Sequence, residues 1–155
     1  MNRSIDELIR LLNDKDDFVV EEAMGELEIR KDESLDPLIE ALSHRKKGIR
    51  LNAATLLGGF ANPKSIPALI ERLKDNNKLV RREASTALSR MGEPAVLPLI
   101  ETLDDEDWRV RGAAAWALGN LGDKRALKHL EKLLSDESGY VKSGAESAIN
   151  TINRD

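Results

Sequence analysis

The chain contains no cysteine, which excludes disulfide bonds and any metal site built on thiolate ligands. Aromatic residues make up only 3% of its 155 residues, so its core has to be built from Leu, Ile, Val and Ala. No apolar run approaches the roughly 20 residues that a membrane-spanning helix needs, and the first residues lack the apolar stretch of a secretory signal. We therefore expect a cytoplasmic protein without a membrane partner.

Charged residues are plentiful but nearly balanced in sign. They form 34% of the chain beside 41% hydrophobic residues, a composition typical of one soluble globular domain. The formal net charge is −4. Because nucleic-acid affinity comes largely from neutralising phosphates, this charge argues against a nucleic-acid partner.

A unit of about 30 residues recurs along the chain. Its apolar positions fall at i, i+4, i+8 and i+11, and then at i, i+3, i+4 and i+7, which are helical spacings. Breakers such as MGEP and LGDKR separate the two helices, and polar joins between units supply Asn or Asp caps. The clearest recurrence matches Val80, Ala84, Leu88, Met91, Gly92, Ile100 and Leu103 with Val110, Ala114, Leu118, Leu121, Gly122, Leu130 and Leu133.

This recurrence predicts an all-α fold, a right-handed α-solenoid (α-α superhelix) of about ten helices. No helix of this length buries its apolar stripe alone, so neighbouring units have to stack into one continuous core. We expect a single domain over residues 1–155. It divides into a half repeat at 4–14, full repeats at 17–44, 47–75, 78–105 and 108–136, and a half repeat at 139–153.

The segment 104–136 resembles the HEAT-like repeat of the phycobilisome-lyase type, often called E-Z HEAT. It has the Val-Arg opening, the Ala-rich first helix, the Leu-Gly-Asp turn and the Leu-Leu-x-Asp close of that repeat. The match extends over 45–103 and weakens at 1–44, where IRKDES replaces the usual turn. The resemblance implies a solenoid whose second helices line the concave surface, and it implies no particular activity.

The sequence offers little for catalysis. His44 and His129 are its two histidines, and neither is followed by Glu, whereas the di-iron hydroxylases among HEAT-like proteins present His-Glu pairs. The glycines follow no phosphate-binding motif. We therefore predict no catalytic residue, no metal and no cofactor. The alternative is an accessory or lyase-like protein related to the phycobiliprotein chromophore lyases.

Two charge ladders run through the repeats. The basic ladder is interpreted as inter-repeat pairing with acids such as Asp75 and Asp105; it comprises Arg50, Arg81, Arg111 and Lys142. The acidic ladder lies in the second helices at roughly 140° from their buried positions; it comprises Glu40, Glu71, Glu101 and Glu131. With the implied concave second helices, it predicts an acidic groove for a basic protein segment around Glu71, Asp75, Glu101 and Asp105. The other interpretation is an ordinary solvated helix face. The basic runs at 44–50 and 78–82 lack interleaved aromatic residues, which argues against their binding nucleic acid.

Both tryptophans stand in the Ala-rich helix of the fourth repeat. Trp116 points roughly 145° away from the buried residues of that helix, and it shares a second apolar stripe with Trp108, Gly112, Ala115 and Gly119. Either this stripe contacts a partner or a second copy through Trp108, Ala115 and Trp116, or its small residues let neighbouring helices pack closely. The sequence as a whole therefore favours a non-enzymatic protein-interaction or scaffold module, with a homodimer through the Trp108/Trp116 face as a further expectation.

Overall fold

The computed structural model describes residues 3–154, and within them the chain is all-helical, with ten α-helices and no strand. This confirms the predicted all-α solenoid. Short 3₁₀ turns at 63–65, 72–74, 93–95, 124–126 and 133–135 flank the later helices. The α-helices are α1 (Ile5–Leu11), α2 (Asp17–Ile29), α3 (Lys31–Ala41), α4 (Lys47–Phe60), α5 (Ile66–Glu71), α6 (Lys78–Ser89), α7 (Val96–Thr102), α8 (Trp108–Leu121), α9 (Leu127–Lys132) and α10 (Gly139–Asn153).

The helices begin and end where the local chemistry directs. The side chains of Asp16, Asn77 and Asp107 accept hydrogen bonds from the first backbone N–H groups of α2, α6 and α8, as the polar joins predict. Helix α8 stops at Gly122, whose φ of 71° is left-handed. Helix α4 stops in the same way at Ala61, a residue with a Cβ, with a φ of 52°.

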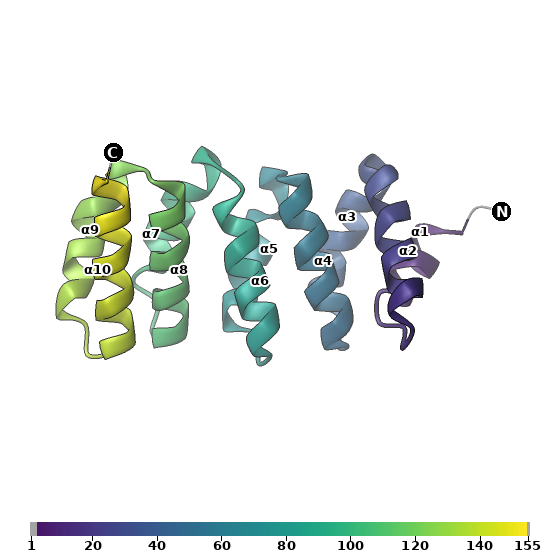
Figure 1. Ribbon diagram of the computed structural model, residues 1–155, viewed down its shortest axis with the longest axis horizontal. Coiled ribbons are helices and arrows are strands. Elements are labelled where there is room, and N and C mark those ends of the chain that lie inside the picture. The colour runs from purple at the N-terminus through teal and green to yellow at the C-terminus, as the bar shows by residue number, and fades with distance from the viewer. Residues whose placement is uncertain (1–2, 155) are drawn as a thin grey trace.

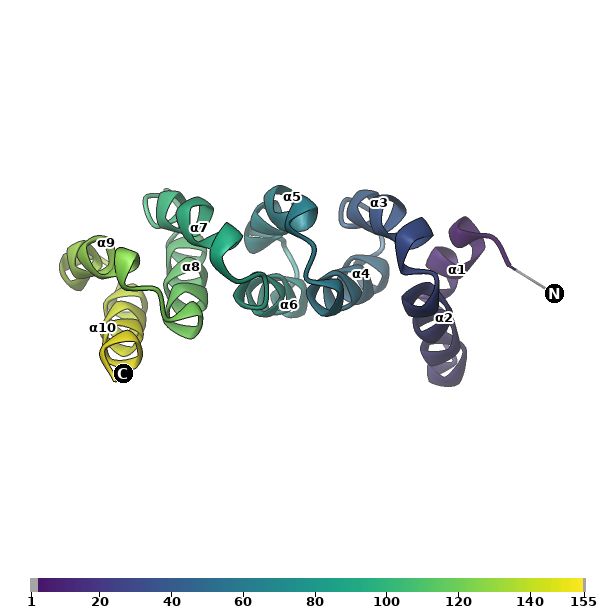
Figure 2. The same ribbon diagram turned by 90° about the horizontal axis from the view of Figure 1, so that it is seen from above.

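The helices form two layers that bend into a shallow arch. Even-numbered helices α2 to α10 form one layer and odd-numbered helices α1 to α9 the other (Figure 1). Seen from above, the ends of the arch turn toward the even-numbered layer, which therefore lies on the inner side (Figure 2). The odd-numbered helices are the second helices of the repeats, so the expectation that second helices line the concave surface is wrong here.

Small residues allow the inner layer to pack closely. A Cβ added to Gly58 on α4 would lie 3.0 Å from the Ala87 Cα on α6, and one added to Gly119 on α8 would lie 2.9 Å from the Ala148 Cα on α10. In these two pairs, α4 with α6 and α8 with α10, the inner helices thus touch almost backbone to backbone. Such close approach shortens the inner layer relative to the outer one, which gives the arch its bend. No helix within 3–154 is long and apolar enough to span a membrane.

A basic aromatic groove on the inner face

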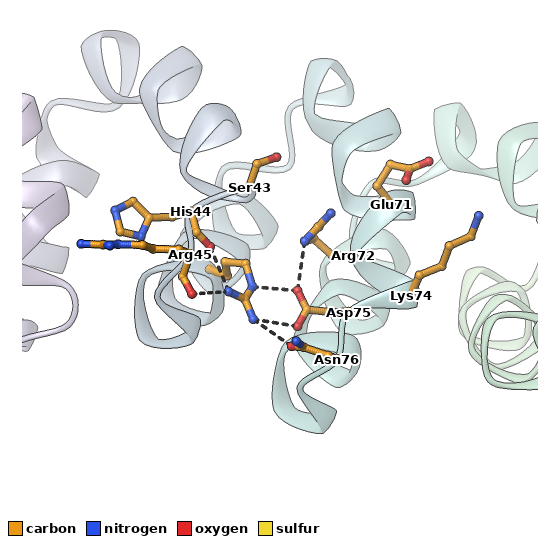
Figure 3. Close-up of a pocket in the computed structure, with 9 residues that line it drawn as sticks. Ser43, His44, Arg45, Glu71, Arg72, Lys74, Asp75 and Asn76 are labelled. Carbon is orange, nitrogen blue, oxygen red and sulfur yellow. Dashed lines mark hydrogen bonds and ion pairs between the residues drawn. The ribbon is translucent and has the colours of Figure 1, made fainter.

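Two hollows of about 520 Å³ each mark the surface, and the first holds a network of ions belonging to the chain itself. Asp75 lies at its centre and is only 4% exposed. The Arg50 side chain donates to both Asp75 carboxylate oxygens, at 2.8 and 3.0 Å, and Arg72 donates at 3.1 Å (Figure 3). Arg50 also donates to the carbonyl oxygens of His44 and Arg45, so one guanidinium links two successive joins.

This network fixes the charge of Asp75. Burial opposes ionisation, but hydrogen bonds from Arg50 and from the backbone N–H of Asn77 outweigh it and hold the pKa of Asp75 below its usual value. The carboxylate is therefore ionised, buried and fully engaged. The expectation that Asp75 offers its charge to a partner segment is wrong, because its side chain has no free surface.

The same device recurs in the fourth repeat. Arg111 donates to both carboxylate oxygens of Asp136, at 2.9 and 3.0 Å, and to the carbonyl oxygens of Asp105 and Glu106. The inter-repeat pairing interpretation of the basic ladder is thus confirmed for Arg50 and Arg111. The third repeat departs from it, since Asp105 lies 3.4 Å from the Lys74 Nζ and Arg81 donates to the Asp75 carbonyl instead.

The glutamates of the acidic ladder are exposed on the outer layer. Glu71 belongs to α5 and Glu101 to α7. Figure 3 shows the Glu71 side chain pointing away from Asp75. Because odd-numbered helices lie on the outer side of the arch, these acids do not line a concave groove. A role of Glu71, Glu101 and Asp105 in binding a partner stays a prediction.

The second hollow is a groove on the inner face between α6 and α8, closed at one end by α10. Its aromatic residues are Trp108, Trp116 and Tyr140, which are 48%, 47% and 62% exposed. They are three of the five aromatic residues of the chain, which has two Trp, one Tyr and two Phe. The other lining residues are Lys78, Arg81, Arg82, Ser85, Thr86, Arg109 and Ala113.

Packing between helices fixes the shape of this groove. Tyr140 meets Trp108 edge to face, with ring centroids 5.4 Å apart and planes at 78°. Gly112 makes room for the Tyr140 ring, which a Cβ at that position would strike. On the floor, the Ser85 hydroxyl of α6 donates to the Ala113 carbonyl of α8 at 3.1 Å. The groove is thus preformed by three successive repeats.

The predicted second apolar stripe divides into two parts. Its small residues pack inside the chain, with Gly119 against Ala148 and with Ala115 at 0% exposure. The expectation that Ala115 contacts a partner is therefore wrong, because neighbouring helices cover it completely. Trp108 and Trp116 keep about half of their surface exposed, as expected for residues on the face of α8 away from the core.

Four cations and no carboxylate line the groove. Among residues 3–154, neither Lys78 nor Arg82 takes part in an ion pair, and Arg81 donates only to a carbonyl oxygen. Arg109 lies 3.1 Å from Asp107, and its hydrogen bond holds the pKa of Asp107 below its usual value. The groove therefore carries excess positive charge on a chain whose net charge is −4.

Sequence reasoning misses the groove because its members come from three repeats. The run 78–82 lacks aromatic residues along the chain, yet in space Trp108, Trp116 and Tyr140 stand beside it. Tyr140 belongs to the last half repeat, outside the stripe that contains both tryptophans. A search of each inter-repeat groove for residues one repeat apart would have brought Lys78 together with Trp108 and Thr86 together with Trp116.

The groove has the chemistry of a binding surface. It contains no His or acidic residue that could serve as a general base, and His129 lies exposed on the outer helix α9. Within 3–154, no group of three or more His, Asp or Glu side chains is placed to hold a metal ion. The exposed indoles of the groove can bury an apolar surface of a ligand, and its unpaired cations can attract an anion.

Comparison with known proteins places this architecture. A family model described as HEAT repeats matches residues 35–103 and 95–150. The complex of CpcE and CpcF of phycocyanin lyase from Nostoc sp. PCC7120 superposes with a TM-score of 0.68 at 21% identity, over 93% of this chain and 96% of that one. These two matches confirm the resemblance noted in the sequence. No curated protein matches the chain.

Two further solved structures share the fold. Human deoxyhypusine hydroxylase in complex with glycerol has a TM-score of 0.67 at 22% identity, and the match covers 97% of this chain and 62% of the hydroxylase. A designed armadillo repeat protein in complex with the peptide (KR)4 has a TM-score of 0.55 at 21% identity, over 96% of this chain and 82% of that one. At these identities the likeness concerns the fold alone.

Proposed function

Because the chain belongs to the HEAT-repeat family, we propose that it is a non-enzymatic protein-interaction module whose inner-face groove binds a segment of a partner protein. The observation that carries this proposal is the gathering of Trp108, Trp116 and Tyr140, all about half exposed, in one preformed groove. Trp and Tyr are enriched among residues that dominate binding energy. A chain with so few aromatic residues leaves most of them at one point of its surface.

The size and setting of the groove support the same proposal. A volume of about 520 Å³ lies within the range of sites that hold small ligands or a few side chains. The groove opens on the inner side of the arch, where a partner segment meets several helices at once. The CpcE–CpcF complex and the armadillo–peptide complex are solenoids bound to a protein or peptide, which supports a protein partner in general.

The test compares Trp116→Ala with Leu97→Ala. Leu97 on α7 is also an exposed large apolar residue, but it lies on the outer layer. Proteins captured from cell extract by the wild type and by Leu97→Ala, and lost with Trp116→Ala, are the expected result. Equal capture by all three forms would refute the proposal, provided that their melting temperatures agree within about 2 °C.

An accessory or lyase-like role stays a prediction, and so do the homodimer through the Trp108/Trp116 face and the cytoplasmic location. The likeness to CpcE and CpcF favours the accessory or lyase-like role only through the shared fold. Mixing the purified protein with a linear tetrapyrrole and recording its visible spectrum tests the role directly. A red shift that Trp116→Ala abolishes would replace the protein segment by a chromophore as occupant of the groove.

A further inference from the structure

We infer that the groove selects an acidic protein segment, one that places carboxylates beside Lys78 and Arg82 and an apolar side chain beside Trp116. This inference rests on the proposed function, since it names the chemistry of the segment that the groove takes. The sequence alone favours the opposite charge, because it leads to a basic segment on an acidic face. The structure reverses that expectation, because Glu71 and Glu101 belong to outer helices while four cations line the groove on the inner face.

The charges of the groove are arranged along its length. Helices α6 and α8 are equivalent helices of successive repeats, so they run in the same direction. Lys78, Arg81 and Arg82 occupy the first half of α6, beside Trp108 and Arg109 at the start of α8. Thr86 and Trp116 lie two turns further along, about 12 Å away at 1.5 Å per residue. The four cations thus gather at one end of the groove together with Trp108 and Tyr140, and Trp116 stands at the other end.

The cations that face the groove are available. Lys78 and Arg82 are exposed and belong to none of the ion pairs within 3–154. Arg109 pairs with Asp107, and the charge of Arg81 also helps to hold the pKa of Asp107 below its usual value. A carboxylate brought to this end therefore meets several free cations and no acidic lining residue, whereas a basic segment meets like charge.

The spacing suits a short segment. Lys78 and Arg82 lie one turn apart, about 6 Å along α6. Alternate side chains of an extended segment are about 6.6 Å apart, and residues one turn apart on a helix are about 6 Å apart. Two carboxylates at either spacing can therefore meet both cations. The remaining distance to Trp116 corresponds to about two further residues of an extended segment, where the apolar side chain would lie.

The experiment selects peptides from a random dodecapeptide phage library on the full chain. Four proteins serve as targets: wild type, Trp116→Ala, the double variant Lys78→Glu/Arg82→Glu, and the control Lys124→Glu/Lys128→Glu. The two double variants change the net charge equally, but Lys124 and Lys128 are exposed outside the groove. We expect the wild type to enrich peptides with two or more carboxylates beside an aliphatic or aromatic residue.

Synthetic copies of the enriched peptides should bind the control as they bind the wild type. Their affinity should fall at least tenfold with Lys78→Glu/Arg82→Glu, and raising NaCl from 50 to 500 mM should weaken it several-fold through screening. Basic or neutral peptides that need Trp116 would overturn the acidic selection and leave the proposed function standing. Failure to enrich any peptide that needs Trp116 would overturn both.

Two other occupants are outcomes of the same series. A labelled oligo(dT) that binds the wild type and loses affinity with both Trp116→Ala and Lys78→Glu/Arg82→Glu would assign the groove to single-stranded nucleic acid and overturn the inference. Sedimentation showing a dimer that Trp116→Ala dissociates would assign it to a second copy of the chain, with the same consequence.

Discussion

Replacing Asp75 by Asn removes one negative charge from the most buried ion pair of the solenoid and changes little else. The side chains of Arg50 and Asp75 are 9% and 1% exposed. Removing one partner of a buried pair leaves an uncompensated charge and costs about 3–5 kcal/mol. Arg50 keeps two carbonyl acceptors and the Asn76 side chain, so we expect about 3 kcal/mol, the low end of that range.

Asp105→Asn is the matched control. In both residues the carboxylate accepts the backbone N–H two positions later, at 2.9 Å, and Asn keeps this acceptor. The difference is that Asp105 is partly exposed and pairs only with Lys74, at 3.4 Å. A surface pair of this kind contributes at most about 1 kcal/mol. The comparison therefore isolates the buried arginine pair.

Urea unfolding and thermal unfolding, both followed by circular dichroism, measure the free energy of unfolding and the melting temperature of both variants. At about 2–4 °C per kcal/mol for a chain of this size, Asp75→Asn should lower the melting temperature by about 6–12 °C and Asp105→Asn by at most about 4 °C. If the two variants lose equal stability, or if Asp75→Asn loses less than about 1 kcal/mol, the assignment of Arg50 and Asp75 as the central inter-repeat link is refuted.

Three further predictions concern stability. The pKa values of Asp75 and Asp136 are lowered in the folded chain, so their stabilisation is present above the unfolded pKa of about 3.9 and is lost as pH falls through the folded values. The deficit of Asp75→Asn in urea midpoint should therefore shrink as the pH is lowered below the unfolded pKa. Gly119→Ala should lower the free energy of unfolding in urea by about 1–3 kcal/mol, because its Cβ would lie 2.9 Å from the Ala148 Cα. Gly25→Ala, which has open space around it inside α2, should raise that free energy by about 0.5–1 kcal/mol. Ala61→Gly should raise the melting temperature by a few degrees, since Ala61 adopts a left-handed conformation that costs about 1 kcal/mol with a Cβ; an unchanged value would show that the strain is absent.

The sequence could predict the fold because every repeat states it again. Helical spacing, breakers and caps recur at a fixed period, so an error in one unit is corrected by the next. Even the first full repeat, where IRKDES replaces the turn, keeps two helices with only Arg30 between α2 and α3. Ser34 donates to the Leu27 and Arg30 carbonyls at that corner. Local pattern and tertiary packing agree at each step.

Curvature and partners in space could not be predicted in the same way. Which layer lies inside depends on how closely adjacent helices approach, and one helix pattern alone does not state that distance. Gly58, Gly119, Ala87 and Ala148 carry the information, but only as pairs from different repeats. Because the second helices form the outer layer, the acidic ladder lies on the outside of the arch. Asp75 is buried in its ion pair with Arg50. Likewise, the sequence of α8 alone does not show that Ala115 is buried, because a neighbouring helix covers it.

The groove is placed where the repeat is interrupted. The recurring apolar positions form the core, and Arg50 and Arg111 of the basic ladder form inter-repeat ion pairs, so these residues hold the solenoid together. Lys78 and Thr86 of α6 occupy the repeat positions that Trp108 and Trp116 occupy on α8. The tryptophans at these two repeat positions make the groove between α6 and α8 aromatic. Tyr140, which packs over Gly112 and against Trp108, adds a third ring. Because these residues leave apolar surface exposed on the inner face, they are the observation on which the proposed binding role rests.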